Sequence, residues 1–364
     1  MLIKDIIAVM EAFAPSSYQE SYDNAGLLSG NSHDECMGVL LCIDCVEAIV
    51  EEAIEKNCNL IIAHHPIIFS GLKKFTGKNY VERTIIKALK HDIAIYAAHT
   101  NLDNMYYGVN HKIAQILELQ HLRILAPQPN TLCKLFTYVP HSHKDEVLNA
   151  LFAAGAGHIG NYAECSFSSS GTGSFQPNIL SNPYIGRIGE RHHEEESKIE
   201  VLFQTYQQQE IIRALLSSHP YEEVAYDIVA LHNPNPYIGA GMIGELNTAM
   251  DEKDFLLWLK DRMDIQHIRH TSLLSQKIHT VALCGGAGSF LLNHAIQAGA
   301  QIFISGDFKY HQFFDADNKI VIADIGHYES EQFTVQLFYD ILYKKFPTFA
   351  LHLTKHNTNP VNFI

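Results

Sequence analysis

The sequence has few basic residues. Its 364 residues include 26 Lys and Arg against 40 Asp and Glu, which gives a formal net charge of -14 at pH 7. A protein that binds the nucleic-acid backbone needs a basic face, so this charge balance makes a nucleic-acid partner unlikely. Acidic balance by itself identifies no other partner.

Signals for secretion and for membrane insertion are also missing. Residues 1–7 lack the basic region, long apolar core and small-residue cleavage site of a signal peptide. No later segment stays apolar long enough to span a bilayer. We therefore expect a cytoplasmic protein with no membrane contact.

Cysteines are few, scattered and odd in number, which is typical of reduced thiols rather than of a disulfide framework. Cys42 and Cys45 form a C-x-x-C pair, but no second pair is present to complete a zinc site. We interpret this pair as structural.

The first third of the chain alternates between apolar strands and amphipathic helices. Helical spacing is found in residues 3–13, 46–56 and 81–90, and short apolar runs in residues 38–44, 60–63 and 93–98. Strands that alternate with helices favour parallel βαβ units and hence an α/β fold. At 364 residues the chain is long enough for two or three domains. Its 47% hydrophobic residues are enough to form a packed core.

Three of the apolar runs end in residues that can bind metals. His64 and His65 end the first, and His99 with Asp103 follows the second. A third run, residues 320–325, leads through Gly326 to His327 and Glu331, which are four apart and lie on one helical face. Imidazole and carboxylate groups are the ligands that divalent transition metals accept.

Each signal has an alternative explanation when it is taken alone. A His-His pair is more often part of a polar loop, and adjacent strand residues point to opposite faces unless Pro66 bends the chain. Asp103 could cap a helix, and Glu331 could complement a helix dipole. Parallel strands of one sheet present their carboxyl ends together, however, so we expect these side chains to converge. Five or six nitrogen and oxygen ligands suit a pair of divalent ions bridged by a carboxylate, with zinc, iron or manganese as candidates.

Five segments of the sequence form a recognisable set. They are Tyr22-Asp23-Asn24-Ala25-Gly26-Leu27, Ala63-His64-His65-Pro66, His99-Thr100-Asn101-Leu102-Asp103, Ser305-Gly306-Asp307-Phe308-Lys309-Tyr310-His311 and Asp324-Ile325-Gly326-His327-Tyr328-Glu329-Ser330-Glu331. Through them the sequence resembles, over essentially its whole length, the family of GTP cyclohydrolase 1 type 2 homologues, also called Nif-three-like proteins. This resemblance implies a homohexamer, toroidal in shape, with two divalent metal ions per subunit. It implies the metal ligands His64, His65, Asp103, His327 and Glu331, with His99 close by.

A different block separates the two metal-bearing parts. We predict a split α/β core, residues 1–124 and 236–364, with an inserted α+β ferredoxin-like domain over residues 125–235. The insert resembles the PII/CutA-like domain of longer family members, through residues 171–175 and 219–223. We expect residues 168–173 to form a small, flexible loop and residues 191–196 to form a charged loop. The glycine-rich residues 171–175 could bind phosphate through their amides, but they lack the lysine of a P-loop and do not clearly open a helix, so we predict a mobile loop there.

Two glycine-rich segments follow the insert. Residues 239–244 have the G-x-G-x-x-G spacing of a dinucleotide site, but no strand clearly precedes them, so we predict a turn into a strand. Residues 285–289 end a strand and precede a helix. Their amides could hold an anion, or the glycines could simply allow close packing.

The metal-binding pattern favours a metal-dependent hydrolase, and the family resemblance implies an activity of the GTP cyclohydrolase kind. In this hypothesis one metal ion activates a water that attacks a nucleotide or other small-molecule ligand, and the second polarises it. His99 and His311 are the candidates for proton transfer, and for each the alternative is a hydrogen-bond partner of the metal ligands. The alternative is a non-enzymatic hexamer that handles metals or acts as a regulatory scaffold.

Overall fold

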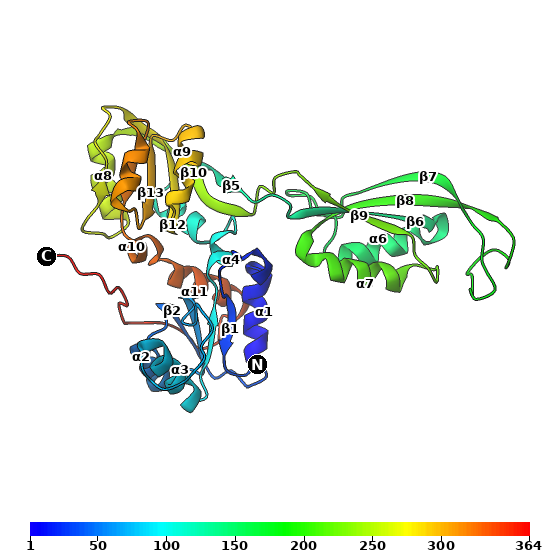
Figure 1. The fold of residues 1–364 in the computed structure, drawn as a ribbon, viewed down its shortest axis with the longest axis horizontal. Helices are drawn as coiled ribbons and strands as arrows, with labels where there is room; N and C mark the ends of the chain where they lie inside the picture. Colours follow the sequence, from blue (N-terminus) through cyan, green and yellow to red (C-terminus); the bar gives the residue numbers. More distant parts are fainter. The chain divides into compact units, whose positions relative to one another are not determined.

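The computed structural model describes residues 1–364 (Figure 1). The chain divides into two compact units, one formed by Met1–Pro127 with Pro236–Ile364 and the other by Gln128–Asn235. We call them the core unit and the insert. The core unit is assembled from both ends of the sequence, and the fold confirms the predicted split α/β core with an α+β insertion.

The first sheet of the core unit has five strands, of which only the edge strand β1 is antiparallel to its neighbour. Its last strand comes from the C-terminal end of the chain and pairs with β2 through Leu351 and Val39. In sheet order the strands are β1 (Gly26–Ser29), β4 (Ala94–Ala97), β3 (Leu60–His65), β2 (Val39–Asp44) and β15 (Leu351–Leu353).

The strands of this sheet are buried on both faces, as continuous apolar runs predict. Leu41 and Ile62 pack on the side of helices α1 (Ile3–Phe13) and α11 (Thr334–Lys345). Leu40 and Ile61, one residue earlier in each strand, pack on the other side with α2 (Glu47–Glu55) and α3 (Tyr80–Lys90). Successive side chains of a strand point to opposite faces of the sheet, so the apolar residues pack against helices on both faces.

The second sheet has six strands, with a parallel centre of β12, β13 and β14. Its edge strand β5 comes from the first part of the chain and pairs with β10, so each chain end contributes to both sheets. The order is β11 (Arg269–His270), β14 (Val321–Asp324), β13 (Ile302–Gly306), β12 (Lys277–Ala287), β10 (Gly239–Asp251) and β5 (Gln120–Pro127). Strand β10 begins at Gly239, so the predicted strand is confirmed, but the turn lies just before residues 239–244, at Pro236 and Tyr237.

One hydrophobic cluster connects the two sheets. It contains side chains of both sheets together with helices α5 (Val109–Ile116), α8 (Glu252–Arg262) and α11. A separate cluster fills the other face of the second sheet under α9 (Leu292–Gln297). Short helices complete the unit: η1 (Ser16–Tyr18), α4 (Thr100–Asp103), η4 (Ser289–Leu291), η5 (Tyr310–Ala316) and α10 (His327–Glu331).

The insert is a four-stranded antiparallel sheet with the order β7-β8-β6-β9. Its two strand-helix-strand units give the ferredoxin-like topology. Helices α6 and α7 cover one face, where they bury Leu135, Val147, Ile199 and Ile211. The elements are β6 (Leu132–Pro140), η2 (His141–His143), α6 (Lys144–Ala153), β7 (Ser166–Phe175), β8 (His192–Gln204), η3 (Thr205–Gln207), α7 (Gln208–Ser218) and β9 (Tyr226–Leu231).

Two sequence-based predictions in the insert are wrong. Residues 168–173 form no loop but lie within β7, which pairs residue by residue with β8 from Ser166 opposite Val201 to Phe175 opposite His192. Most of the charged segment 191–196 also belongs to β8. Both stretches lie in a largely exposed hairpin, so they lack the alternation of apolar side chains that marks a half-buried strand.

None of the helices combines the length and apolar composition that crossing a lipid bilayer requires.

Candidate metal centre

The metal-binding candidates converge at the ends of strands from two different sheets. His64 and His65 end β3, and Asp103 lies in α4 after β4, both in the first sheet. His327 and Glu331 lie in α10, which follows β14 of the second sheet. The expectation that one sheet presents all three strand ends is therefore wrong. Convergence depends on the packing of the two sheets.

His64 and His65 both face the same cluster, with ring centroids 4.9 Å apart. His64 is completely buried, and its Nδ1 lies 2.9 Å from the carbonyl oxygen of Ala98. This carbonyl can only accept, so Nδ1 carries a proton, and Nε2 of the neutral ring has the lone pair that a metal ion needs.

Carboxylates hold the Nδ1 atoms of three further histidines. Each pair is close enough for a direct hydrogen bond, which fixes the ring and leaves its Nε2 for another partner. The distances are 2.7 Å for His65 and Asp44, 2.7 Å for His99 and Asp23, and 2.8 Å for His327 and Asp307.

Glu331 lies at the centre of the cluster and is only 3% exposed. Its Oε2 is 2.9 Å from Nε2 of His65, 3.3 Å from Nε2 of His327 and 3.6 Å from Nε2 of His64. Gly286 in β12 makes room for this carboxylate, because a Cβ there would collide with Glu331 Oε1. The glycine-rich end of β12 thus serves close packing against Glu331.

Two buried polar atoms of the cluster have no hydrogen-bond partner: Nε2 of His64 and Oδ1 of Asp103. They lie 3.7 Å apart, and Oε2 of Glu331 lies 3.6 Å from the same nitrogen. Leaving buried acceptors unpaired is costly, and a cation among them removes that cost. The ligand atoms of His64, His65 and Glu331 lie within 4.8 Å of one another, so this group could hold a metal ion.

The charges in the cluster shift the pKa values of its members strongly. Burial lowers the pKa of His65, but hydrogen bonds to Asp44 and Glu331 outweigh it and raise the pKa to about 10. Burial likewise opposes protonation of His327, yet Glu331 and Asp307 raise its pKa to about 9. Burial raises the pKa of Asp103 to about 6. The cluster thus attracts positive charge, which protons supply in the absence of metal ions.

A cavity of about 620 Å³ opens onto the cluster. His65, Asp103, His327 and Glu331 form part of its wall. His99 also lines it, with its ring centroid 5.4 Å from that of His64. A small molecule in this cavity would contact the cluster directly.

The structure therefore brings together His64, His65, Asp103, His327 and Glu331, with His99 beside them. His311 is not in the group: it lies exposed in η5, with its ring 5.2 Å from that of Tyr310, and it does not line the cavity. Within one chain, His99 is therefore the better placed of the two proton-transfer candidates.

Sequence reasoning did not assign a role to Asp23, Asp44 and Asp307. A signal for Asp44 was present, because it ends a strand adjacent to β3 and pairs in register with His65. Asp23 and Asp307 lie in quoted motifs, but their partners His99 and His327 are 76 and 20 residues away in sequence. Only the folded chain shows which histidine each carboxylate holds.

Fold and site together define a protein whose α/β core unit has two sheets with a candidate metal centre between them. The family model Duf34/NIF3 (NGG1p interacting factor 3) matches residues 1–360, and the chain belongs to this family. It is 39% identical to the GTP cyclohydrolase 1 type 2 homolog of Bacillus subtilis over 367 residues, which cover 99% of this chain and 98% of that protein.

Two further similarities agree with this assignment. The GTP cyclohydrolase 1 type 2 homolog of Halalkalibacterium halodurans is 41% identical over 324 residues, 88% of this chain and 87% of that protein. The crystal structure of a Bacillus cereus protein related to NIF3 superposes with a TM-score of 0.87 at 36% identity, covering 100% of this chain and 99% of that one.

Proposed function

We propose that this chain is a metal-dependent hydrolase with a dinuclear centre, acting on a nucleotide or a related small molecule. The observation that carries the proposal is the unpartnered Nε2 of His64, 3.6 Å from the buried carboxylate of Glu331. With Nδ1 protonated, this imidazole interacts favourably with Glu331 only if positive charge lies between them, which a second proton supplies in metal-free protein and a metal ion would supply in loaded protein.

Five donor residues exceed the needs of one tetrahedral ion, which takes four ligands. We propose that His64, His65, Asp103, His327 and Glu331 hold two divalent ions and that Glu331 bridges them. The central position of Glu331 Oε2, within 3.6 Å of three imidazole nitrogens, supports this role. All ligands are nitrogen or oxygen, which favours zinc, iron or manganese over copper(I).

Divalent ions in such a site act as Lewis acids and make water nucleophilic near neutral pH. The residues of the chain supply the rest. His99 lines the cavity and keeps a free Nε2, because Asp23 holds its Nδ1, so it can accept a proton from a reacting group. Asp23 accepts a further hydrogen bond from the backbone N–H of Thr100, which fixes it in place.

The wall of the cavity suggests which part of a nucleotide would lie there. Tyr22, Phe69 and Phe290 line it and are more than half exposed, with the rings of Tyr22 and Phe69 6.4 Å apart. Such rings can stack on a flat heterocycle. No Lys or Arg lines the cavity to neutralise phosphates. We therefore propose that the base, rather than the phosphate chain, is held beside the metal centre.

We also propose that the protein works as a homohexamer, as its resemblance to the family suggests. Light scattering coupled to size-exclusion chromatography tests this directly. A mass near six chains supports the proposal, and a stable monomer would contradict it.

Turnover of GTP and of guanosine by metal-loaded protein tests the proposed activity. Protein loaded with zinc, manganese or iron(II) should hydrolyse at least one of them, and His65→Ala and Glu331→Ala should lower the rate by about 100-fold or more. His193→Ala removes an exposed histidine of the insert and should leave the rate unchanged.

Two ions per chain without turnover of either compound would contradict the cyclohydrolase activity. The same result would favour a role in metal handling or as a regulatory scaffold. Transfer of the ions to an acceptor protein or chelator would then be the property to measure.

A further inference from the structure

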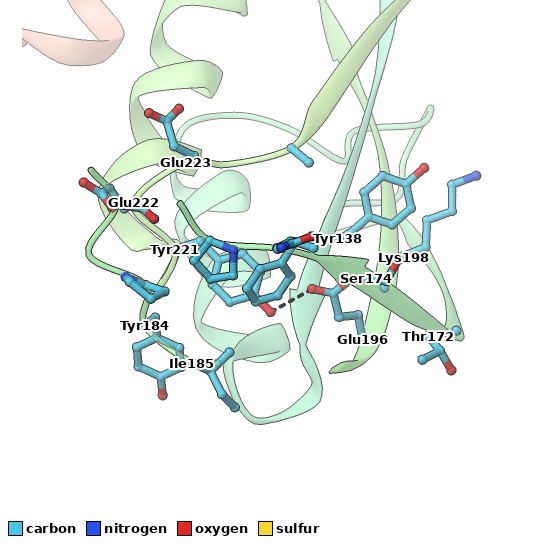
Figure 2. Close-up of a pocket in the computed structure, with 18 of the residues that line it drawn as sticks. Tyr138, Thr172, Ser174, Tyr184, Ile185, Glu196, Lys198, Tyr221, Glu222 and Glu223 are labelled. Carbon is cyan, nitrogen blue, oxygen red and sulfur yellow. Dashed lines mark hydrogen bonds between the residues drawn. The ribbon is translucent and has the colours of Figure 1, made fainter. Parts of the chain in front are cut away.

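The insert contains a cavity of its own, of about 690 Å³, which is separate from the metal centre (Figure 2). Ligand pockets in proteins usually measure about 300–1,000 Å³. Both insert segments that stood out in the sequence, residues 171–175 and 219–223, contribute to its wall. Tyr138 and Lys198 also line it, and they alternate with Val139 and Ile199, which pack under the helices. The cavity therefore lies on the sheet face away from α6 and α7.

Glu196 is the unusual residue of this cavity. Its side chain lines the wall although the residue is only 7% exposed. The hydroxyl of Tyr221 donates to its Oε1 at 2.8 Å, the dashed line in Figure 2, and no protein donor reaches Oε2. No Lys, Arg or His forms an ion pair with this carboxylate. A buried carboxylate without a cationic partner is energetically costly. A ligand that supplies the missing positive charge would explain why the cavity contains one.

The two segments hold this carboxylate in position. Gly173 lies directly against it, and a Cβ at that residue would collide with Glu196 Oε2. On the other side, Nε2 of buried His219 lies 2.9 Å from the carbonyl of Tyr138, so this nitrogen donates. Nδ1 then accepts from the backbone N–H of Tyr221 at 3.1 Å, which places the Tyr221 hydroxyl on Glu196. Residues 171–175 and 219–223 thus both position the Glu196 carboxylate.

The rest of the wall suits a cation with an apolar body. Phe175 and Tyr184 flank Tyr221, with ring centroids 5.9 and 6.3 Å from its own, and their faces can attract a positive charge. Lys198 is the only basic residue of the wall. Its Nζ lies 3.1 Å from Glu200 and over the ring of Phe136, and Figure 2 shows it pointing away from Glu196.

We propose that this cavity binds a small organic cation, a protonated amine or guanidinium group carried on an apolar body. Glu196 pairs with the charge, and the aromatic rings contact the body. A bare divalent ion fits less well, because calcium takes six to eight oxygen ligands. Glu222 and Glu223 also line the cavity, but both are exposed, and Figure 2 shows them apart from Glu196 rather than converging on one point with it. This site is independent of the proposed hydrolase activity.

Calorimetric titration of the full-length protein with three probes of one shape tests the proposal. Benzylamine carries a positive charge, benzyl alcohol is neutral, and benzoate is negative. Benzylamine should saturate one site per chain and bind about tenfold or more tightly than either of the others, because a hydrogen bond to a charged group is worth this much. Equal binding of benzyl alcohol, or no benzylamine binding at millimolar concentration, would overturn the proposal.

Variants test whether Glu196 is the residue that pairs with the cation. Glu196→Gln keeps the shape and the contact with Tyr221, and it should weaken benzylamine binding about tenfold without affecting benzyl alcohol. Glu195→Gln removes the same charge from the exposed neighbour and should change nothing. Gly173→Ala should displace Glu196 and weaken binding similarly. Unchanged binding in folded Glu196→Gln would also overturn the proposal. If that variant does not fold, the three probes on the unaltered protein decide.

Discussion

The Nε2 atom of His65 lies 2.9 Å from Oε2 of Glu331, although 266 residues separate them along the chain. His65 ends a strand of the first sheet, and Glu331 lies in the helix after a strand of the second. The candidate metal centre therefore exists only when the two sheets pack together. Metal binding and packing of the core unit should be coupled for the same reason.

Metal loading should release protons. The pKa values of His65 and His327 are raised to about 10 and about 9, so both imidazoles are protonated at pH 7.5 in metal-free protein. Binding requires the neutral form, and each ligand must then lose its proton. We expect release of about two protons per chain and metal affinity that rises about 100-fold per pH unit near neutrality. Calorimetric zinc titrations in buffers of different ionisation enthalpy measure the number of protons released. Zero release would contradict the assignment of His65 and His327 as metal ligands.

Gly286→Ala should weaken metal binding by forcing the Glu331 carboxylate aside. The new Cβ would collide with Glu331 Oε1, and the residue has φ of +62°. Gly299→Ala is the matched control, because Gly299 also has positive φ, +79°, but nothing lies within 4 Å of its added Cβ. Both variants should lose about 1 kcal/mol of stability from backbone strain. Only Gly286→Ala should bind zinc less tightly in competition with a chromophoric chelator.

Asp44→Asn should lower metal affinity although Asp44 is not among the proposed ligands. Asp44 holds Nδ1 of His65 at 2.7 Å, and outer carboxylates of this kind contribute about 10–100-fold to affinity. The exposed Asp145→Asn serves as the control. The same chelator competition measures the effect, and equal affinity for the two variants would show that His65 needs no carboxylate.

Asp23 should stabilise the fold in a pH-dependent manner. Burial raises its pKa, but hydrogen bonds from His99 and Thr100 outweigh this and lower it from 3.8 to about 2. A depressed carboxyl pKa stabilises the folded state above pH 4 and loses that effect as the pH falls toward 2. Asp23→Asn should cost about 2 kcal/mol at pH 7 and about half of that at pH 3, measured by urea denaturation. If the loss of stability in Asp23→Asn did not change with pH, the ionised form of Asp23 would not be what stabilises the fold.

Much of the centre could be predicted from the sequence because its signals are local. The apolar runs before His64 and His327 mark buried strands, and polar residues just past such strands indicate a site at a sheet edge. That the strands belong to two sheets could not be predicted, since β15 and β5 each cross to the sheet of the other chain half. The strand at residues 199–203 of β8 was expected, but β7 and the exposed first part of β8 were missed, because their polar residues carry no strand periodicity.

The metal content of the protein tests the central claim most directly. The protein and its Glu331→Gln variant would be loaded with zinc, desalted and analysed by mass spectrometry of the elements. A dinuclear centre bridged by Glu331 predicts about two ions per chain in the unaltered protein and a loss of both from the variant. A single ion in the unaltered protein, or two ions retained by the variant, would contradict it.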